Sequence, residues 1–494
     1  MSLKFKSQKT NGVYSKIFIN KASRMLIKIN TTPFAHMEEE SEHFIDKVSI
    51  REATVLQKIG FHPNIITPKF ISLRGPPNDC TVFLPTSKDG ESPPSQACLA
   101  IGMELGVVLE RKKKGLVVTN SEIATFLHHV AFGLVYAHGC DIAHRDIKPD
   151  NIIKTSDGFY QLIDWGLAGL APSEKQSDSK RYVTRWYRPP ELLDQETEQS
   201  DHRAADIWAL AITMLEIFFN PSQLFANAVR PQLFTAIHLS KQTPSQIQTF
   251  FRGAPVAGGL ADLLSQMLTR DPSLRISAEN IISHPFVSQY TAYAPPCLPS
   301  FSFNFNSTRL SKGAIPLVIR EKMYEWLCNL WAYYPTNIRT IVLFTAYEIC
   351  DRYSRVVGVE HLPAYQTIGC ASMAIADSLY DTWSLSHEDY VTVSGNFFTI
   401  ADLEQTIYSI SKTLEWNLYT PGVYTQWKSR VRDSDNIQSV VALAAAIADR
   451  KKYKWSSLKI VGASLQKLRI PKRFTLFRRL LAAEQKPSLS PLIF

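Results

Sequence analysis

The sequence lacks the features that mark membrane, secreted and disulfide-stabilised proteins. Its 494 residues contain no uninterrupted run of about 18 apolar residues, the length that a membrane-spanning helix needs. The N-terminus has no apolar core of a secretory signal. The seven cysteines are odd in number and scattered, and they form no Cys-x-x-Cys pair, which argues against a disulfide framework or a zinc site. We therefore expect an intracellular protein, cytoplasmic or nuclear, that acts without a membrane.

A large excess of one charge is also missing. Lys and Arg total 54 against 45 Asp and Glu, which leaves a net charge of +9. The basic residues gather at Arg111–Lys114 and between Arg450 and Arg479. Such clusters attract acidic partners or nucleic acid, but they also occur as ordinary solvated surface. No nucleic-acid-binding motif accompanies them, so we prefer the solvated surface and expect no nucleic-acid partner.

The length predicts two or three domains, each with a core of its own. Strand-like runs such as Met25–Ile29 and Ala100–Met103 flank a helical stretch from Glu42 to Gly60, whose apolar residues recur at helical spacing. A linker-like stretch rich in Pro and Ser precedes an almost wholly helical C-terminal part. The segments expected along the chain are 1–106, 107–290, 291–312, 313–422 and 423–494.

The most informative motif lies between residues 144 and 166. It is His144-Arg-Asp-Ile-Lys-Pro-Asp-Asn151, followed by Asp164-Trp-Gly166. The motif resembles the catalytic loop and metal-binding loop of protein kinases, which usually have the forms H-R-D-x-K-x-x-N and D-F-G. The resemblance implies that Asp146 accepts the proton of the substrate hydroxyl, while Lys148 neutralises the phosphate and favours Ser/Thr acceptors. Asn151 and Asp164 are then the Mg²⁺ ligands.

The N-terminal segment contains candidates for ATP binding. By resemblance to kinases, Lys28 is the strand lysine that holds the α- and β-phosphates, and Glu52 on the following helix is its ion-pair partner. Met103 corresponds to the gatekeeper residue. Glu104 and Leu105 correspond to the hinge that binds adenine through its backbone.

Later motifs resemble structural anchors of the kinase C-lobe, which follows its N-lobe in the chain. Pro189-Pro-Glu191 and Arg275 are expected to supply a Glu–Arg pair, and Asp206 is expected to brace the catalytic loop. Because several independent motifs agree in order and separation, we favour a kinase fold strongly over a chance match.

Two positions depart from the kinase pattern. Trp165 replaces the usual Phe but is still a large apolar side chain. In the Gly-rich loop only Gly12 matches, since Ser7 and Lys9 stand where the first two glycines allow backbone amides to approach the phosphates. The loop leaves open a catalytically weak scaffold that binds partners through both domains.

The kinase-like part most resembles the cyclin-dependent kinases. Ile50-Arg51-Glu52 is similar to their cyclin-contacting helix, and the stretch from Tyr182 to Glu191 is similar to the segment that forms a pocket for proline after the target Ser/Thr. In that segment Thr184 and Arg188 match family positions. The resemblance therefore implies protein substrates with Ser/Thr-Pro sites.

Phosphorylation of the activation loop is a further expectation. Ser179 falls at the activating position of the family, where phosphate orders the loop by pairing with arginines. Two such arginines are present, Arg51 and Arg145, but the third family position is Gly169.

The C-terminal half resembles a cyclin box. Arg320 and Trp326 match the first-helix motif, and Asp351-Arg352-Tyr353 matches a later one. An unrelated helical bundle is the alternative, which the order of the motifs disfavours. The sequence as a whole predicts an α+β, two-lobed protein kinase fold followed by an all-α cyclin-box domain, with residues 423–494 as a shortened second repeat and basic tail.

The expected activity is Ser/Thr phosphorylation with ATP and Mg²⁺. The cyclin-like domain is expected to activate the kinase by contact within one chain, or by swapped contact between two chains. A third possibility is a kinase activated by another partner, with the helical domain as a docking arm.

Overall fold

The computed structural model divides the chain into two compact units, Met1–Ser300 and Phe301–Phe494. We call them unit 1 and unit 2 and describe each by itself. The described residues are 3–4, 6–8, 15–20, 25–30, 47–73, 82–83, 99–104, 106–108, 118–170, 187–193, 201–219, 258–291, 317–333, 340–357, 362–380, 385–419, 440 and 443–444.

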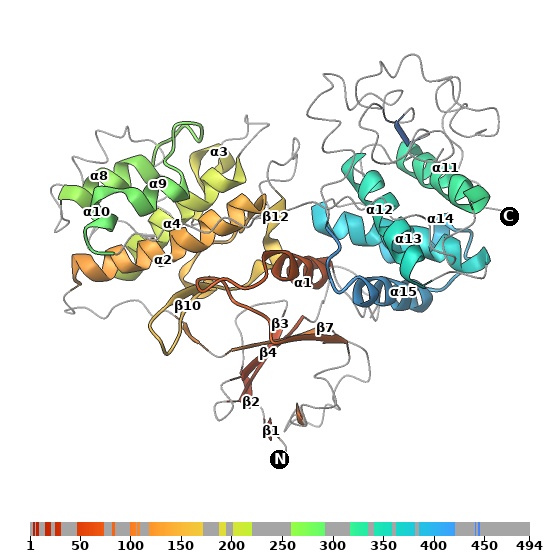
Figure 1. Ribbon diagram of the computed structural model, residues 1–494, viewed down its shortest axis with the longest axis horizontal. Coiled ribbons are helices and arrows are strands. Elements are labelled where there is room, and N and C mark those ends of the chain that lie inside the picture. The colour runs from red at the N-terminus through yellow and green to blue at the C-terminus, as the bar shows by residue number, and fades with distance from the viewer. Residues whose placement is uncertain are drawn as a thin grey trace. The chain divides into compact units, whose positions relative to one another are not determined.

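Unit 1 begins with an antiparallel sheet of five strands (Figure 1). In spatial order the strands are β2 (Lys6–Gln8), β3 (Ser15–Asn20), β4 (Met25–Asn30), β7 (Leu99–Glu104) and β5 (Phe70–Leu73). The strands predicted around residues 25–29 and 100–103 are thereby confirmed, and in their register Lys28 is opposite Ile101. A short parallel pair joins β1 (Leu3–Lys4) to β6 (Val82–Phe83).

Helix α1 (Lys47–Ile59) follows β4 in the chain. The helical stretch predicted from the sequence began at residue 42, and residues 42–46 lie outside the described part. The helix buries Ile50, Val55, Leu56 and Ile59, which recur at the predicted helical spacing. It ends at Ile59, and the next residue, Gly60, has a φ of +68°, a left-handed conformation that glycine adopts without steric cost.

The rest of unit 1 is mainly helical. Its helices are α2 (Asn120–Gly139), α3 (Pro190–Leu193), α4 (His202–Phe218), α8 (Gly258–Met267), α9 (Ala278–Ser283) and α10 (Pro285–Ser288). Short strands also occur in this part of the chain: β8 (Val107–Val108), β9 (Ile142–Ala143), β10 (Ile152–Lys154), β11 (Tyr160–Leu162) and β12 (Gly169–Leu170). Thr119 caps α2 by accepting a hydrogen bond from the Glu122 backbone N–H.

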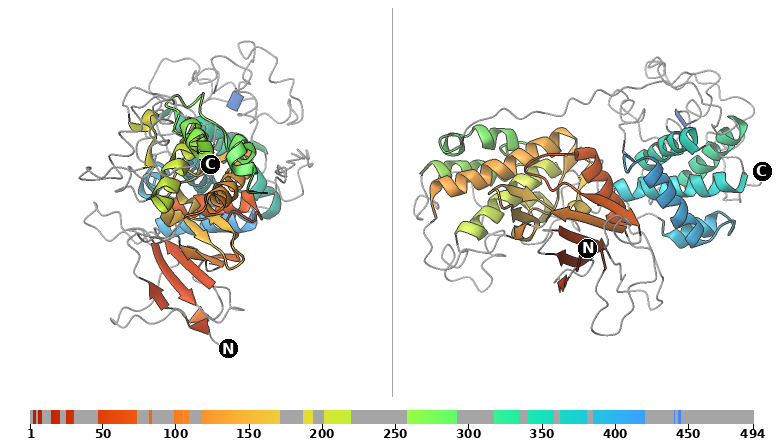
Figure 2. Two further views of the ribbon diagram at one scale, coloured as in Figure 1. Left: turned by 90° about the vertical axis from the view of Figure 1, so that its left-hand side faces the viewer. Right: turned by 60° about the horizontal axis from the view of Figure 1, so that its bottom comes forward.

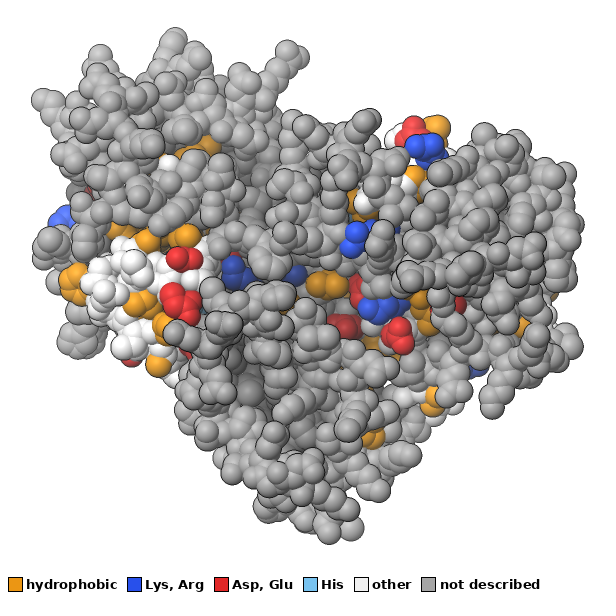
Figure 3. All heavy atoms as spheres, turned by 180° about the vertical axis from the view of Figure 1, so that it is seen from behind, with side chains coloured by type: hydrophobic (Ala, Val, Ile, Leu, Met, Phe, Trp, Pro, Cys, Tyr) orange, Lys and Arg blue, Asp and Glu red, His pale blue; other side chains and the backbone are white. Residues whose placement is uncertain are grey.

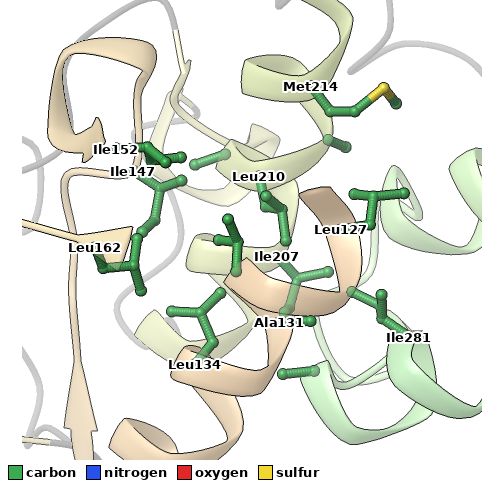
Figure 4. Packing of buried hydrophobic residues seen from close by; sticks show 14 of the residues in the cluster. Leu127, Ala131, Leu134, Ile147, Ile152, Leu162, Ile207, Leu210, Met214 and Ile281 are labelled. Atoms are coloured by element: carbon green, nitrogen blue, oxygen red, sulfur yellow. The ribbon is translucent and has the colours of Figure 1, made fainter. Parts of the chain in front are cut away.

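The core of this helical lobe forms where α2 and α4 meet the short strands (Figure 4). Leu127, Ala131 and Leu134 come from α2, and Leu210 from α4 packs against them together with Ile147. All of these side chains are completely buried. The loops of the motif at residues 144–166 are therefore anchored in a close-packed core.

Unit 2 contains only helices in its described part (Figure 2). They are α11 (Leu317–Tyr333), α12 (Thr340–Val357), α13 (Leu362–Tyr380), α14 (His387–Val393) and α15 (Ile400–Thr413). Helix α13 contacts α11, α12 and α15 and buries small side chains such as Ala371 and Ala374. Capping boxes at Ser386 and Thr399 fix the starts of α14 and α15. The second repeat expected in 423–494 lies almost wholly outside the described residues.

Within the described part of the chain, no helix combines the length and hydrophobicity needed to cross a membrane. On the face shown in Figure 3, the described acidic and basic side chains lie interspersed with hydrophobic ones. The basic clusters noted in the sequence, at 111–114 and 450–479, lie outside the described residues.

Candidate active site

Strand β4 and helix α1 bring a lysine and a glutamate together in unit 1. The Lys28 ammonium donates to both carboxylate oxygens of Glu52, at 2.9 and 3.2 Å. The Glu52 side chain is fully buried and that of Lys28 is 9% exposed. The ion pair proposed from the sequence, across 24 residues of chain, is thus present in the structure.

A second carboxylate reaches the same ammonium. Lys28 Nζ lies 2.6 Å from Asp164 Oδ1, and the Asp164 side chain is 44% exposed. Burial alone would lower the pKa of Lys28, but the Asp164 and Glu52 carboxylates outweigh it and hold that pKa above its ordinary value. Burial would likewise raise the pKa of Asp164, whereas Lys28 lowers it. Lys28 and Asp164 are therefore both charged at neutral pH.

The loop after β11 places Asp164 at the edge of the lobe. Its φ of 61° and ψ of 71° are left-handed, and a 3₁₀ turn follows at Trp165–Leu167. Trp165 is fully buried, with its ring centroid 4.6 Å from that of His144. At Gly166 a Cβ atom would come within 2.5 Å of Val48 on α1, so only glycine lets the helix approach this closely.

The catalytic loop holds Asp146 through two neighbours. Lys148 Nζ donates to Asp146 Oδ2 at 2.6 Å. Asn151 Nδ2 donates to the same oxygen at 2.9 Å and to the Asp146 carbonyl at 2.8 Å. These three residues, which the sequence placed in one motif, thus form one hydrogen-bonded group.

A buried carboxylate on α4 braces the loop from below. Asp206 accepts hydrogen bonds from the backbone N–H groups of His144 and Arg145, each at 2.8 Å. It also lies 3.0 Å from His138 Nε2 on α2. Arg145 adopts a φ of 66°, a conformation that costs energy for a non-glycine residue and that these contacts support.

Oxygen atoms suited to a divalent cation remain in this site. Both described hydrogen bonds of the Asn151 amide use its nitrogen, which leaves the amide oxygen as a potential ligand. Asp164 binds Lys28 through Oδ1, so its Oδ2 is the corresponding atom there. Carboxylate and amide oxygens suit Mg²⁺, which is usually bound by few protein side chains plus phosphate and water. The described residues contain no cluster of three or more His, Cys, Asp or Glu side chains.

The expected adenine-binding residues are only partly described. Met103 is 6% exposed at the end of β7, and Glu104 is the last residue of that strand. Leu105 and Gly12 lie outside the described residues. The sequence interpretation missed Gly106: a Cβ there would lie 2.4 Å from Ile153, so the chain passes against β10 at a distance that only glycine permits.

The comparisons with known proteins now decide the family. The sequence-family model of the protein kinase domain matches residues 10–287, more than half of the 494 residues. The chain belongs to the protein kinase family. The model of the cyclin N-terminal domain matches residues 304–419, so a kinase domain is followed by a cyclin domain, as the sequence predicted. We now call unit 1 the kinase unit and unit 2 the cyclin-like unit.

Several kinases are similar in sequence. Mitogen-activated protein kinase MPS1 of Pyricularia oryzae is 25% identical over 314 residues, which cover 58% of this chain and 71% of that protein. Mitogen-activated protein kinase spm1 of Schizosaccharomyces pombe is 30% identical over 224 residues, or 39% of this chain and 52% of that protein. Among solved structures, the CAK complex from Chaetomium thermophilum bound to ATP-γ-S has a TM-score of 0.42 and 20% identity, covering 57% of this chain and 90% of that chain.

The residues expected to regulate the kinase unit are only partly described. Ser179 and Thr184 lie outside the described residues, and Arg188 is half-buried. Arg51 donates from Nη1 to the Gly166 carbonyl at 3.1 Å. The Arg145 guanidinium is packed against Gly169, where a Cβ would lie 1.8 Å from its Cζ. The position at which the resemblance implied a third arginine therefore has no room for a side chain unless Arg145 moves.

The C-lobe anchors meet as the resemblance implied. Arg275 donates to both oxygens of Glu191, at 2.8 and 2.9 Å, and both side chains are buried. Such a bidentate pair fixes the first turn of α3 to the loop before α9.

The cyclin motif residues also meet in space. Arg320 on α11 donates from Nε and Nη2 to the two carboxylate oxygens of Asp351 on α12, at 2.7 and 2.9 Å. Trp326 is 2% exposed, and Arg352 donates to the Asn417 carbonyl at 2.6 Å. Burial alone would lower the pKa of Arg320, but Asp351 more than offsets this and holds it above its ordinary value. The two motifs thus form one buried bridge between the first two helices.

Proposed function

We propose that this chain is a Ser/Thr protein kinase of the cyclin-dependent type, which transfers the γ-phosphate of ATP to Ser or Thr followed by Pro. The observation that carries the proposal is the assembled group of Lys28, Glu52 and Asp164, together with the catalytic-loop Asp146 that Lys148 and Asn151 hold. In kinases the lysine–glutamate pair and the metal-binding aspartate must both be in place for phosphoryl transfer.

The proposed roles follow from the contacts. Asp146, held by Lys148 and Asn151, orients the substrate hydroxyl and accepts its proton. Lys148 neutralises charge on the transferred phosphoryl group, and Lys28, positioned by Glu52, binds the α- and β-phosphates. The oxygens of Asn151 and Asp164 would hold Mg²⁺, which would supply further charge neutralisation. Phosphoryl transfer depends mainly on such positioning and electrostatics.

The choice of acceptor rests on two features of the sequence. Lys148 is the residue that, by resemblance, favours Ser/Thr acceptors over Tyr. The stretch from Tyr182 to Glu191 resembles the segment that accommodates proline after the target residue. Similarity to mitogen-activated protein kinases supports the Ser/Thr class.

We further propose that the cyclin-like unit activates the kinase unit by contacting α1. Ile50-Arg51-Glu52 resembles the cyclin-contacting helix of the family, and the two units share one chain. Tethering makes the contact intramolecular, with an effective concentration on the order of millimolar for a short flexible linker. Pairing between two chains is the alternative arrangement.

The test is Mg·ATP-dependent phosphorylation of a Ser-Pro peptide by the full chain, compared with the same peptide carrying Ser-Ala. We expect transfer to the Ser-Pro peptide that is lost in Asp164→Asn. If the full chain transfers no phosphate, even after treatment with an activating kinase, the enzyme proposal fails. Mg·ATP binding without transfer would instead favour the catalytically weak scaffold that the departures at Ser7 and Lys9 suggest.

A further inference from the structure

The last turn of α1 carries a lysine that reaches out of its own lobe. Lys58 is half-buried, and its Nζ donates to the backbone carbonyl of Cys140 at 2.6 Å. The residue before it, Gln57, is exposed. The sequence comparison with kinases drew no attention to Lys58, because it is not part of any motif.

Its acceptor lies at the end of α2. Cys140 is the C-terminal cap of that helix, and its own N–H bonds back to the carbonyls of Tyr136, Ala137 and His138. The last carbonyls of a helix lack partners within the helix, and they carry the negative end of its dipole. An ammonium at this point satisfies an orphan acceptor and the dipole together.

The ammonium is held there against a cost. Burial lowers the pKa of Lys58 to about 8, although the nearby Cys140 and Asp141 oppose that shift. A neutral side chain would avoid this penalty.

Other contacts lie around this hydrogen bond of Lys58. In its other half, Arg51 donates to the Gly166 carbonyl and Glu52 accepts hydrogen bonds from Lys28. Just beyond α1, Asn64 donates from its side chain to the Tyr160 carbonyl at 2.9 Å, and its own carbonyl accepts from the Leu162 N–H at 2.9 Å. The C-terminal end of α1 and the loop after it are thus fixed to the C-lobe. Glu52 lies about 9 Å along the helix from Lys58, at a rise of about 1.5 Å per residue.

We infer that Lys58 is a positioning residue, which anchors the C-terminal end of α1 to the end of α2 and thereby sets where Glu52 meets Lys28. The half of α1 that carries Arg51 and Glu52 extends from this anchored end. The inference deepens the proposed function. Its consequence for catalysis rests on that function.

The test measures the position of α1 without relying on catalysis. Hydrogen exchange of α1 amides is followed in the full chain for wild type, Lys58→Met, Lys58→Arg and the neighbouring control Gln57→Met. We expect exchange in α1 to rise about tenfold in Lys58→Met, the effect of losing one hydrogen bond to a charged group. Exchange in the middle of α2 should stay unchanged, Lys58→Arg should largely restore protection, and Gln57→Met should match wild type.

Thermal unfolding and kinetics separate positioning from a merely structural role. If Lys58 only stabilised the fold, Lys58→Met would lower Tm. The inference predicts a Tm no lower than that of wild type, together with a lower kcat/KM for the peptide that Lys58→Arg restores. Unchanged α1 exchange in Lys58→Met, or an equal rise in Gln57→Met, would overturn the inference. If Lys58→Met does not fold, Lys58→Gln replaces it. Because exchange is measured without substrate, an inactive wild type would defeat the proposed function and leave this result standing.

Discussion

The Lys28–Glu52 pair of the kinase unit and the Arg320–Asp351 pair of the cyclin-like unit are both buried, yet their charges are satisfied differently. Arg320 and Asp351 make two parallel hydrogen bonds, and their side chains are 2% and 7% exposed. Lys28 instead shares its ammonium between buried Glu52 and half-exposed Asp164. One pair is closed, whereas the other opens through Asp164 to the surface.

The difference separates a structural bridge from a working site. The charges of the bidentate Arg320–Asp351 pair neutralise each other and leave none to bind a ligand, so the role of the pair is to join α11 to α12. In the kinase unit the excess of carboxylate around one ammonium leaves oxygen atoms that can bind a cation, and leaves Lys28 able to exchange partners with a phosphate. The predictions below test this contrast, beginning with the largest expected effect.

Asp164→Asn should remove activity while sparing the fold. Loss of a group that manages transition-state charge is expected to reduce kcat by roughly 10³-fold or more. Lys28 keeps Glu52 in the variant, so thermal unfolding should change little. Peptide phosphorylation and a melting curve, with the exposed Asp157→Asn as control, check both parts. A large loss of stability would show that Asp164, like Asp351, has a structural role.

Asp351→Asn should have the opposite character. It leaves the Arg320 guanidinium buried without its counter-charge, which typically costs about 3–5 kcal/mol of unfolding free energy. Denaturant unfolding followed by tryptophan fluorescence measures this loss. The double variant Arg320→Met/Asp351→Leu is the matched control, since removing both charges is expected to cost less than removing one. A single variant as stable as wild type would contradict the account.

Gly169→Ala should have a smaller effect within the kinase unit. The new Cβ would occupy the position of the Arg145 guanidinium, which is buried and must move. Because Arg145 precedes Asp146 directly, we expect kcat to fall about tenfold, the order of one displaced hydrogen-bonded group. Gly259→Ala, where the nearest atom lies at 3.5 Å, is the control. Full activity in Gly169→Ala would show that the guanidinium has no role beyond packing.

The smallest expected effect is a pH dependence through Lys58. With a folded pKa of about 8, below its ordinary 10.5, its ammonium loses its proton as the pH rises through about 8. We expect kcat/KM to decline above that pH by a few fold, and Lys58→Arg to remove the decline because its guanidinium stays charged. The same shift makes this group's contribution to stability rise between pH 8 and 10.5, since the unfolded chain binds the extra proton there. A wild-type profile identical to that of Lys58→Arg would rule out this titration.

Local motifs foretold much of the site, because short loops fix side chains at set spacings. Lys148 and Asn151 meet Asp146 within one loop, so their sequence spacing was enough. The contact of Lys28 with Glu52 required a family resemblance, since no local rule brings a strand residue to a helix residue so far along the chain. The strands followed from strand-like apolar runs and the α1 helix from helical spacing.

Other features could not be foreseen from the sequence. Gly106 and Gly169 matter because of what lies against them, and a glycine shows no side chain that could signal this. Lys58 resembled any exposed helix lysine, and only the end of α2 beside it gives it a partner. The pairing of Arg320 with Asp351 likewise depends on how two helices pack, although both residues were singled out by their motifs.

The claim that one chain carries both the kinase and its activator is tested most directly by dividing it. The kcat/KM for the Ser-Pro peptide would be measured for the full chain, for residues 1–300 alone, and for residues 1–300 with residues 301–494 added. The account predicts that the kinase unit alone is at least about 100-fold less active, corresponding to roughly 2.7 kcal/mol, and that adding the cyclin-like unit restores activity in proportion to its concentration. Equal activity of the kinase unit and the full chain would contradict it.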